Sequence, residues 1–90
     1  MAPRWSLIYS AEATRQLRDL DPPNSRRLVK YLEERVLTSD DPRRLGKAQR
    51  GSEWGDCWRY RCGDYRIIAN IVDRDVVVVV LRVGHRKNVY

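Results

Sequence analysis

Three arginines in the last third of the chain are the residues best suited to chemistry. Arg59, Arg61 and Arg66 lie on either side of the dipeptide Gly63-Asp64. The planar guanidinium group of arginine grips phosphate oxygens with two hydrogen bonds at once and keeps its positive charge at any working pH. A group of arginines therefore indicates a phosphate-rich ligand and stabilisation of negative charge, whereas proton removal must fall to another residue.

The Gly63-Asp64 dipeptide predicts how these arginines are arranged. Glycine at the first central position is typical of a two-residue β-hairpin turn. Such a turn pairs Cys62 with Tyr65, Arg61 with Arg66, Tyr60 with Ile67 and Arg59 with Ile68. The arginines then share one face of the hairpin. The other face carries an apolar set suited to a core: Trp58, Tyr60, Cys62, Tyr65 and Ile67. A slip of one residue would send every arginine to the opposite face.

The predicted pair Arg61–Arg66 costs stability, because like charges opposite each other on neighbouring strands repel. A small domain has only about 5–15 kcal/mol of stability in total. The simplest reason to keep the pair is a polyanion that binds between the two charges.

A second group of candidate residues follows Gly84 and comprises His85, Arg86, Lys87 and Tyr90. Cations beside His85 favour its neutral form, which can accept a proton; a structural role is the alternative. Tyr90 can stack on an unpaired base. Arg82 precedes this group, but the turn around Asp73 leaves its register open.

Residues 38–56 show no convincing periodicity, and we expect a loop there. This stretch is basic and includes Lys47 and Arg50. A loop of this length in a small domain is usually functional, and the alternative is a connector that happens to be basic.

Composition bounds the class of protein. Ninety residues form a single domain, 1–90, and the formal net charge is +6, from 18 Lys and Arg against 12 Asp and Glu. This charge indicates an anionic partner, which is nucleic acid, an acidic protein or an anionic membrane, unless it is only a basic surface. No apolar run approaches the roughly 18 residues of a membrane span, and no signal-peptide pattern begins the chain.

Cysteine and histidine usage predicts the compartment and the cofactors. On one strand, Cys57 and Cys62 would face opposite sides and would not pair. Unpaired cysteines without a secretion signal fit the cytoplasm. One histidine and no zinc-like spacing predict a protein without a metal or another cofactor.

The elements expected to position these residues form an α+β domain. We expect a strand at 4–9 and a helix capped by Ser10, with Ala13, Leu17 and Leu20 on its apolar face. After a break at 21–24, we expect a second helix at about 25–37. Strands at 58–62, 65–72 and 76–83 follow. The prediction is an N-terminal strand and a two-helix hairpin packed on an antiparallel sheet of about four strands.

The order and spacing of several motifs resemble the RelE/ParE superfamily of toxin–antitoxin toxins over nearly the whole chain. The motifs are Asp41-Pro42, Leu45-Gly46, Trp58-Arg59-Tyr60-Arg61, Gly63-Asp64-Tyr65-Arg66, Gly84-His85-Arg86 and Val89-Tyr90. The resemblance implies a bacterial or archaeal toxin held inactive by a small acidic, RelB-like antitoxin. Members of the RelE branch cut messenger RNA on the ribosome without metal, and members of the ParE branch poison DNA gyrase.

The resemblance also implies roles for individual residues. The positions used by the RelE branch are suitably occupied by Arg59, Arg61, Arg66, Arg86 and Tyr90, which favours a ribosome-dependent mRNA endoribonuclease (mRNA interferase). In this reading the 2′-hydroxyl attacks the adjacent phosphate and leaves a 2′,3′-cyclic phosphate. The expected catalytic residues are Arg61, Arg66, Arg86, His85 and Tyr90, and the expected RNA-binding residues are Arg59, Lys47, Arg50, Arg82 and Lys87.

The sequence leaves three points open. Some RelE-type members have lysines where this chain has Arg59 and Arg61, so the general base is His85, Tyr90 or Lys87. A ParE-like gyrase inhibitor is the alternative toxin, and a nucleic-acid-binding module without catalysis is the alternative to an enzyme.

Overall fold

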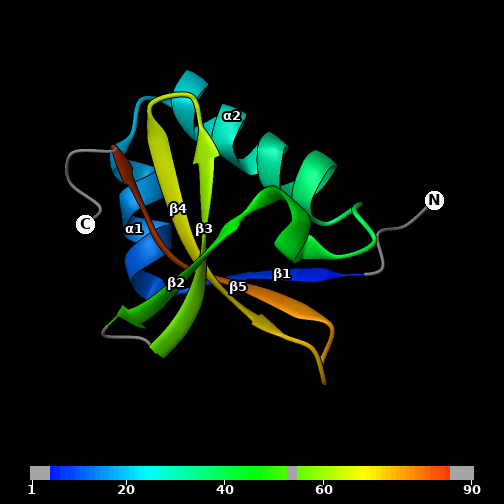
Figure 1. The fold of residues 1–90 in the computed structure, drawn as a ribbon. Coiled ribbons are helices and arrows are strands. Elements are labelled where there is room, and N and C mark those ends of the chain that lie inside the picture. The colour runs from blue at the N-terminus through cyan, green and yellow to red at the C-terminus, as the bar shows by residue number, and fades with distance from the viewer. Residues whose placement is uncertain (1–4, 53–54, 86–90) are drawn as a thin grey trace.

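The fold is a five-stranded sheet with two helices on one side of it (Figure 1). The computed structural model describes residues 5–52 and 55–85, with side chains at all of these except 49–52, 55 and 56. The strands are β1 (Ser6–Tyr9), β2 (Lys47–Ser52), β3 (Gly55–Cys62), β4 (Tyr65–Val72) and β5 (Val77–His85). Their order across the sheet is β1-β5-β4-β3-β2. The predicted α+β class is confirmed.

Two features of the sheet go beyond the prediction. The stretch expected to be a loop contains strand β2, which pairs antiparallel with β3 and adds a fifth strand at one edge. At the other edge, β1 pairs parallel with β5, so the sheet is mixed. β5 begins at Val77, because Val76 adopts a φ of 53° in the preceding turn.

Helix α1 (Ala11–Asp19) follows β1 in the chain and packs against β5. As predicted, Ser10 caps this helix: its Oγ accepts a hydrogen bond from the Ala13 amide at 3.0 Å. The same hydroxyl donates to the Leu81 carbonyl of β5 at 2.8 Å. Six residues further on, the Gln16 Oε1 atom accepts a hydrogen bond from the Val83 amide at 2.6 Å. Side chains of α1 therefore satisfy backbone groups of β5 beyond the end of β1.

Helix α2 (Pro22–Tyr31) begins earlier than the predicted residue 25, and its last turns continue as the π-helical segment η1 (Leu32–Val36). Pro22 and Pro23 occupy the first helical turn, where their fixed φ suits a helix and no backbone donor is needed. The two prolines, which were predicted to lie in the break between the helices, therefore form the first turn of the second helix. None of the described helices is long and apolar enough to cross a membrane.

The main core lies between the helices and one face of the sheet. Leu28, Leu32 and Val36 are fully buried there against Tyr60 and Ile67 of the hairpin, among other residues. Cys62 belongs to this core, whereas Cys57 lies in a separate small cluster with Ile68 and Leu81. The two cysteines do not form a disulfide with each other, as their spacing predicted. This packing leaves the arginines of the hairpin on the face opposite the core.

Candidate nucleic-acid interface

The β3–β4 hairpin has the predicted register. Arg61 pairs with Arg66, and Arg59 pairs with Ile68. The turn depends on Gly63, which has a φ of 60°, a value that glycine adopts without steric cost. The structure therefore confirms that the two arginines lie directly opposite each other.

The neighbouring strands extend the arginine-bearing face on both sides. Lys47 of β2 lies opposite Arg59, and Arg82 of β5 lies opposite Ile68. Because residues directly opposite each other in a sheet point to the same side, one row across the sheet carries Lys47, Arg59 and Arg82. The next row carries Arg61 and Arg66. We call these five residues the cationic face.

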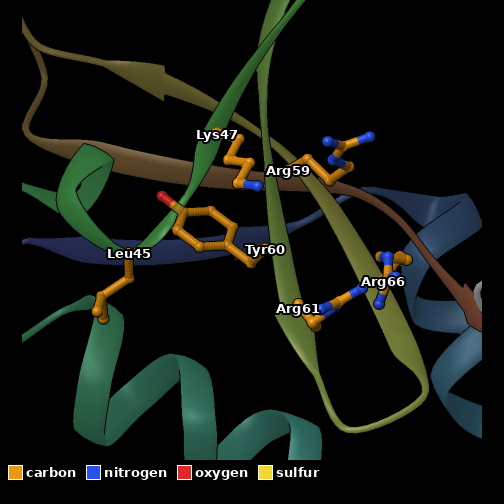
Figure 2. A pocket seen from close by; sticks show the side chains of 6 residues that line it. All are labelled: Leu45, Lys47, Arg59, Tyr60, Arg61 and Arg66. Atoms are coloured by element: carbon orange, nitrogen blue, oxygen red, sulfur yellow. The ribbon is translucent and has the colours of Figure 1, made fainter.

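Four of these cations line a single pocket of about 260 Å³, together with Leu45 and Tyr60 (Figure 2). The four are Lys47, Arg59, Arg61 and Arg66, and none of the six lining residues is acidic. In Figure 2, the side chain of Arg61 points across the hairpin toward Arg66, and that of Lys47 extends from β2 to β3, where its amine lies between Tyr60 and Arg59. Lys47 and Arg61 are exposed, whereas Arg66 is only 9% exposed. The pocket is small, open and cationic, which suits a phosphate and its attached sugar.

Tyr60 forms one wall of the pocket and is held rigidly. Its ring is fully buried, and its hydroxyl donates a hydrogen bond to the Pro42 carbonyl at 2.6 Å. Burial raises the pKa of this phenol well above its ordinary value. Tyr60 was predicted to be a core residue rather than a platform for bases, and its burial confirms this. Neither its hydroxyl nor its proton is available for chemistry at neutral pH.

Gly46 brings the start of β2 against this wall. It follows the 3₁₀ turn η2 (Pro42–Leu45). A methyl group added at Gly46 would come within 3.0 Å of Tyr60 Cε1 and 3.1 Å of the Arg59 carbonyl oxygen. Any larger residue would therefore require Tyr60 or the β3 backbone to shift by a few tenths of an ångström, and glycine lets the start of β2, with Lys47, lie close to β3 without such a shift.

Arg43 lies in η2, shortly before Lys47 in the sequence, but it has a structural role and does not line the pocket. Its guanidinium group forms ion pairs with Asp41 at 3.2 Å and with Asp73 at 2.5 Å. The same group lies over the ring of Trp58 at 5.9 Å from its centroid. Arg43 thereby connects η2 to the β4–β5 turn, and its charge is balanced by these two carboxylates of the same chain.

Arg82 and His85 were predicted site residues that the structure does not bring into the pocket. The Nε atom of Arg82 lies 3.8 Å from the Oε1 atom of Glu12 on α1, at the margin of the cationic face. His85 lies opposite Tyr65, and their rings meet edge to face with centroids 5.9 Å apart. Because Tyr65 packs against the main core, the imidazole is on the other face of the sheet from Arg61 and Arg66.

Sequence and structural comparisons assign this architecture to a family. Residues 7–90 match the family model of the ParE toxin of the type II toxin–antitoxin system parDE. The chain belongs to the RelE/ParE superfamily of toxin–antitoxin toxins. A search of the curated proteins finds no match.

Solved structures of RelE toxins share the fold. The toxin–antitoxin complex RelBE2 of Mycobacterium tuberculosis contains a chain 31% identical to this one, with a TM-score of 0.82 and coverage of 98% of this chain and 97% of the other. A mutant of the Escherichia coli toxin RelE in the free state is 32% identical, with a TM-score of 0.75 and coverage of 99% and 88%. The archaeal RelE–RelB complex of Pyrococcus horikoshii, 23% identical with a TM-score of 0.69 and coverage of 94% and 98%, shows the same fold.

Other predicted site residues of this toxin lie outside the described part of the chain. They are Arg86, Lys87 and Tyr90, and for Arg50 the side chain. The pocket also includes one residue that sequence reasoning missed. Leu45 belongs to the Leu45-Gly46 motif of the family resemblance, but it lies in a segment without periodicity, so no sequence pattern indicated that its side chain lines the site.

Proposed function

We propose that this toxin is an mRNA endoribonuclease that halts translation until its antitoxin binds. One observation carries the proposal: Lys47, Arg59, Arg61 and Arg66 converge on one pocket, and none of the residues that line it in the described part of the chain is acidic. Like charges opposite each other on neighbouring strands, as at Arg61 and Arg66, repel, and the phosphates of a sugar–phosphate chain bound in the pocket would offset this repulsion.

The proposed reaction needs no group other than RNA and the side chains of this chain. The ribose 2′-hydroxyl attacks the adjacent phosphate, and the 5′-oxygen leaves, giving a 2′,3′-cyclic phosphate and a free 5′-hydroxyl. Arg61 and Arg66 stabilise the extra negative charge that develops on the phosphate oxygens, and Arg59 holds the RNA backbone. Arg86 stabilises the charge on the leaving oxygen. The position of His85 across the sheet favours Tyr90 or Lys87 as the base that accepts the 2′-hydroxyl proton.

The antitoxin and the ribosome complete the proposal. The RelE chains of the similar structures are seen with their RelB antitoxins. For this chain we propose an acidic, RelB-like antitoxin that covers the cationic face. Tyrosine and lysine are weak candidates for a general base at neutral pH, which suits an enzyme whose substrate is positioned by a larger assembly. We propose ribosome-bound message in the cytoplasm as the substrate.

The test is to induce the toxin in cells and to map the 5′ ends of transcripts. New 5′-hydroxyl ends within coding regions are expected for the wild type, and Arg61→Ala should lower their number by about 100- to 1,000-fold, the usual loss for one oxyanion-stabilising donor. In purified form, the toxin should cut ribosome-bound message far faster than free RNA. Equal rates on both would remove the ribosome-dependent part of the proposal.

A second candidate function rests on the family model, which describes ParE toxins of parDE systems. A ParE-like toxin would inhibit DNA gyrase and would cause double-strand DNA breaks while transcripts keep their length. The same induction experiment separates the two activities when DNA integrity is measured beside the transcript ends. Salt-sensitive RNA binding without cleavage in any context would instead indicate a module that only binds nucleic acid.

A further inference from the structure

The proposed reaction leaves one requirement that the arginines cannot meet. When the bond between phosphorus and the 5′-oxygen breaks, the electron pair stays on an oxygen that is a strong base, and the oxygen needs a proton. Arginine does not give up a proton in proteins. Arg59, Arg61 and Arg66 can therefore stabilise charge on the phosphate, but none of them can protonate the leaving group. This inference rests on the proposed RNA cleavage.

The lining of the pocket narrows the choice of donor. Besides the three arginines it contains Leu45, Tyr60 and Lys47. Leu45 has no proton to give. The Tyr60 hydroxyl is buried and already donates to the Pro42 carbonyl at 2.6 Å, so its proton points away from the pocket. Among the lining residues that the structure describes, Lys47 alone has an acidic proton that it can transfer and is accessible to a ligand.

The position of Lys47 suits this role. Its backbone lies opposite Arg59 in the β2–β3 ladder, and the close packing of Gly46 on Tyr60 fixes that register. The side chain is exposed and extends from β2 to β3, where its amine lies between Tyr60 and Arg59 (Figure 2). An ammonium group on a flexible four-carbon stem carries three protons and is charged in its ordinary state. It stands beside the arginine that holds the backbone, one row from Arg61 and Arg66.

We propose that Lys47 is the proton donor to the leaving 5′-oxygen. The bond from the 2′-oxygen to phosphorus forms as the bond from phosphorus to the 5′-oxygen breaks. The electron pair of the broken bond goes to the 5′-oxygen, and a proton passes to it from the Lys47 Nζ atom. The products are a 2′,3′-cyclic phosphate and a 5′-hydroxyl, and the neutral amine takes up a proton from water.

The experiment compares Lys47→Arg with the wild type on two substrates. One is ordinary ribosome-bound message, and the other carries sulfur in place of the bridging 5′-oxygen at the cut site. Arginine keeps the positive charge but cannot donate a proton, so Lys47→Arg should cut ordinary message about 100- to 10,000-fold more slowly, the range for loss of a general acid. A thiolate leaves without a proton, because thiols are far more acidic than alcohols. On the sulfur substrate the variant should therefore cut within a few-fold of the wild-type rate.

Two controls make the result specific. Lys30→Arg changes an exposed lysine on α2, outside the pocket, and should leave both rates unchanged. Arg61→Ala removes charge stabilisation and should slow both substrates equally. A Lys47→Arg variant that cuts ordinary message at the wild-type rate, or that is slowed equally on both substrates, would overturn the proposal and leave Lys47 a phosphate-binding residue. If the wild type cuts neither substrate, the failure is that of the proposed function itself.

Discussion

Replacing Arg61 with glutamine should lower RNA cleavage by about 100- to 1,000-fold and at the same time raise the stability of the toxin in the absence of RNA. Arg61 is exposed, forms no ion pair with the residues that the structure describes, and lies directly opposite Arg66. Opposed side chains have Cβ atoms about 5 Å apart. Two unit charges roughly 6 Å apart in a water-like dielectric repel by about 0.7 kcal/mol.

The gain is measurable in a domain of this size. For 60–100 residues, 1 kcal/mol shifts the melting temperature by about 4–8 °C, so Arg61→Gln should melt about 3–6 °C higher in dilute buffer. Thermal unfolding followed by circular dichroism measures the shift. At 1 M salt the screening length falls to about 3 Å, and most of the gain should disappear.

Arg74→Gln is the matched control. Arg74 is exposed in the β4–β5 turn between Asp73 and Asp75, so removing its charge should bring no gain and the same salt should not alter the comparison. A melting temperature of Arg61→Gln below that of the wild type in dilute buffer would refute the reasoning, because Arg61 would then stabilise the fold rather than strain it.

The remaining predictions concern the supports of the pocket. Tyr60→Phe removes the buried hydrogen bond to the Pro42 carbonyl and should cost about 1–3 kcal/mol in urea denaturation; an unchanged midpoint would contradict the role given to the hydroxyl. Gly63→Ala forces a side chain into a φ of 60° and should lower the free energy of unfolding by about 1–2 kcal/mol, seen as an earlier thermal transition. The backbone amide of Arg43, and then its side chain, lowers the pKa of Asp41, so the stabilisation by this carboxylate is complete above about pH 4 and is lost as the pH falls through the lower pKa of the folded state. The melting temperatures of the wild type and Asp41→Asn should therefore differ at pH 6 and converge toward pH 2; a difference that persists at pH 2 would argue against the charge.

Local signals in the sequence predicted what local physics decides. The Gly63-Asp64 turn sets the register of the hairpin, and the register alone places Arg61 opposite Arg66. Ser10 capped a helix as expected because its hydroxyl acts within three residues.

Long-range pairing decided the rest. β2 has no alternating pattern, since Lys47–Ser52 reads KAQRGS, and it forms because β3 offers it a partner. The face that His85 occupies depends on the β4–β5 register, which shifts between Ile68 and Ala69. The sequence of the turn around Asp73 does not predict this register shift. For the same reason, the site of Arg82 beside Glu12 could not be read from the sequence.

The parallel pairing of β1 with β5 affects how soon after the start of its synthesis the toxin can reach its folded form. The contact between Ser10 and Leu81 spans 71 positions of the chain, so the first strand leaves the translating ribosome long before its mate exists. Synthesis proceeds from the N-terminus, and contacts this distant in sequence form slowly. A growing chain cannot complete its sheet until β5 has been synthesised. An antitoxin already in the cell can therefore bind the new chain before its fold, and with it the cationic pocket, is complete.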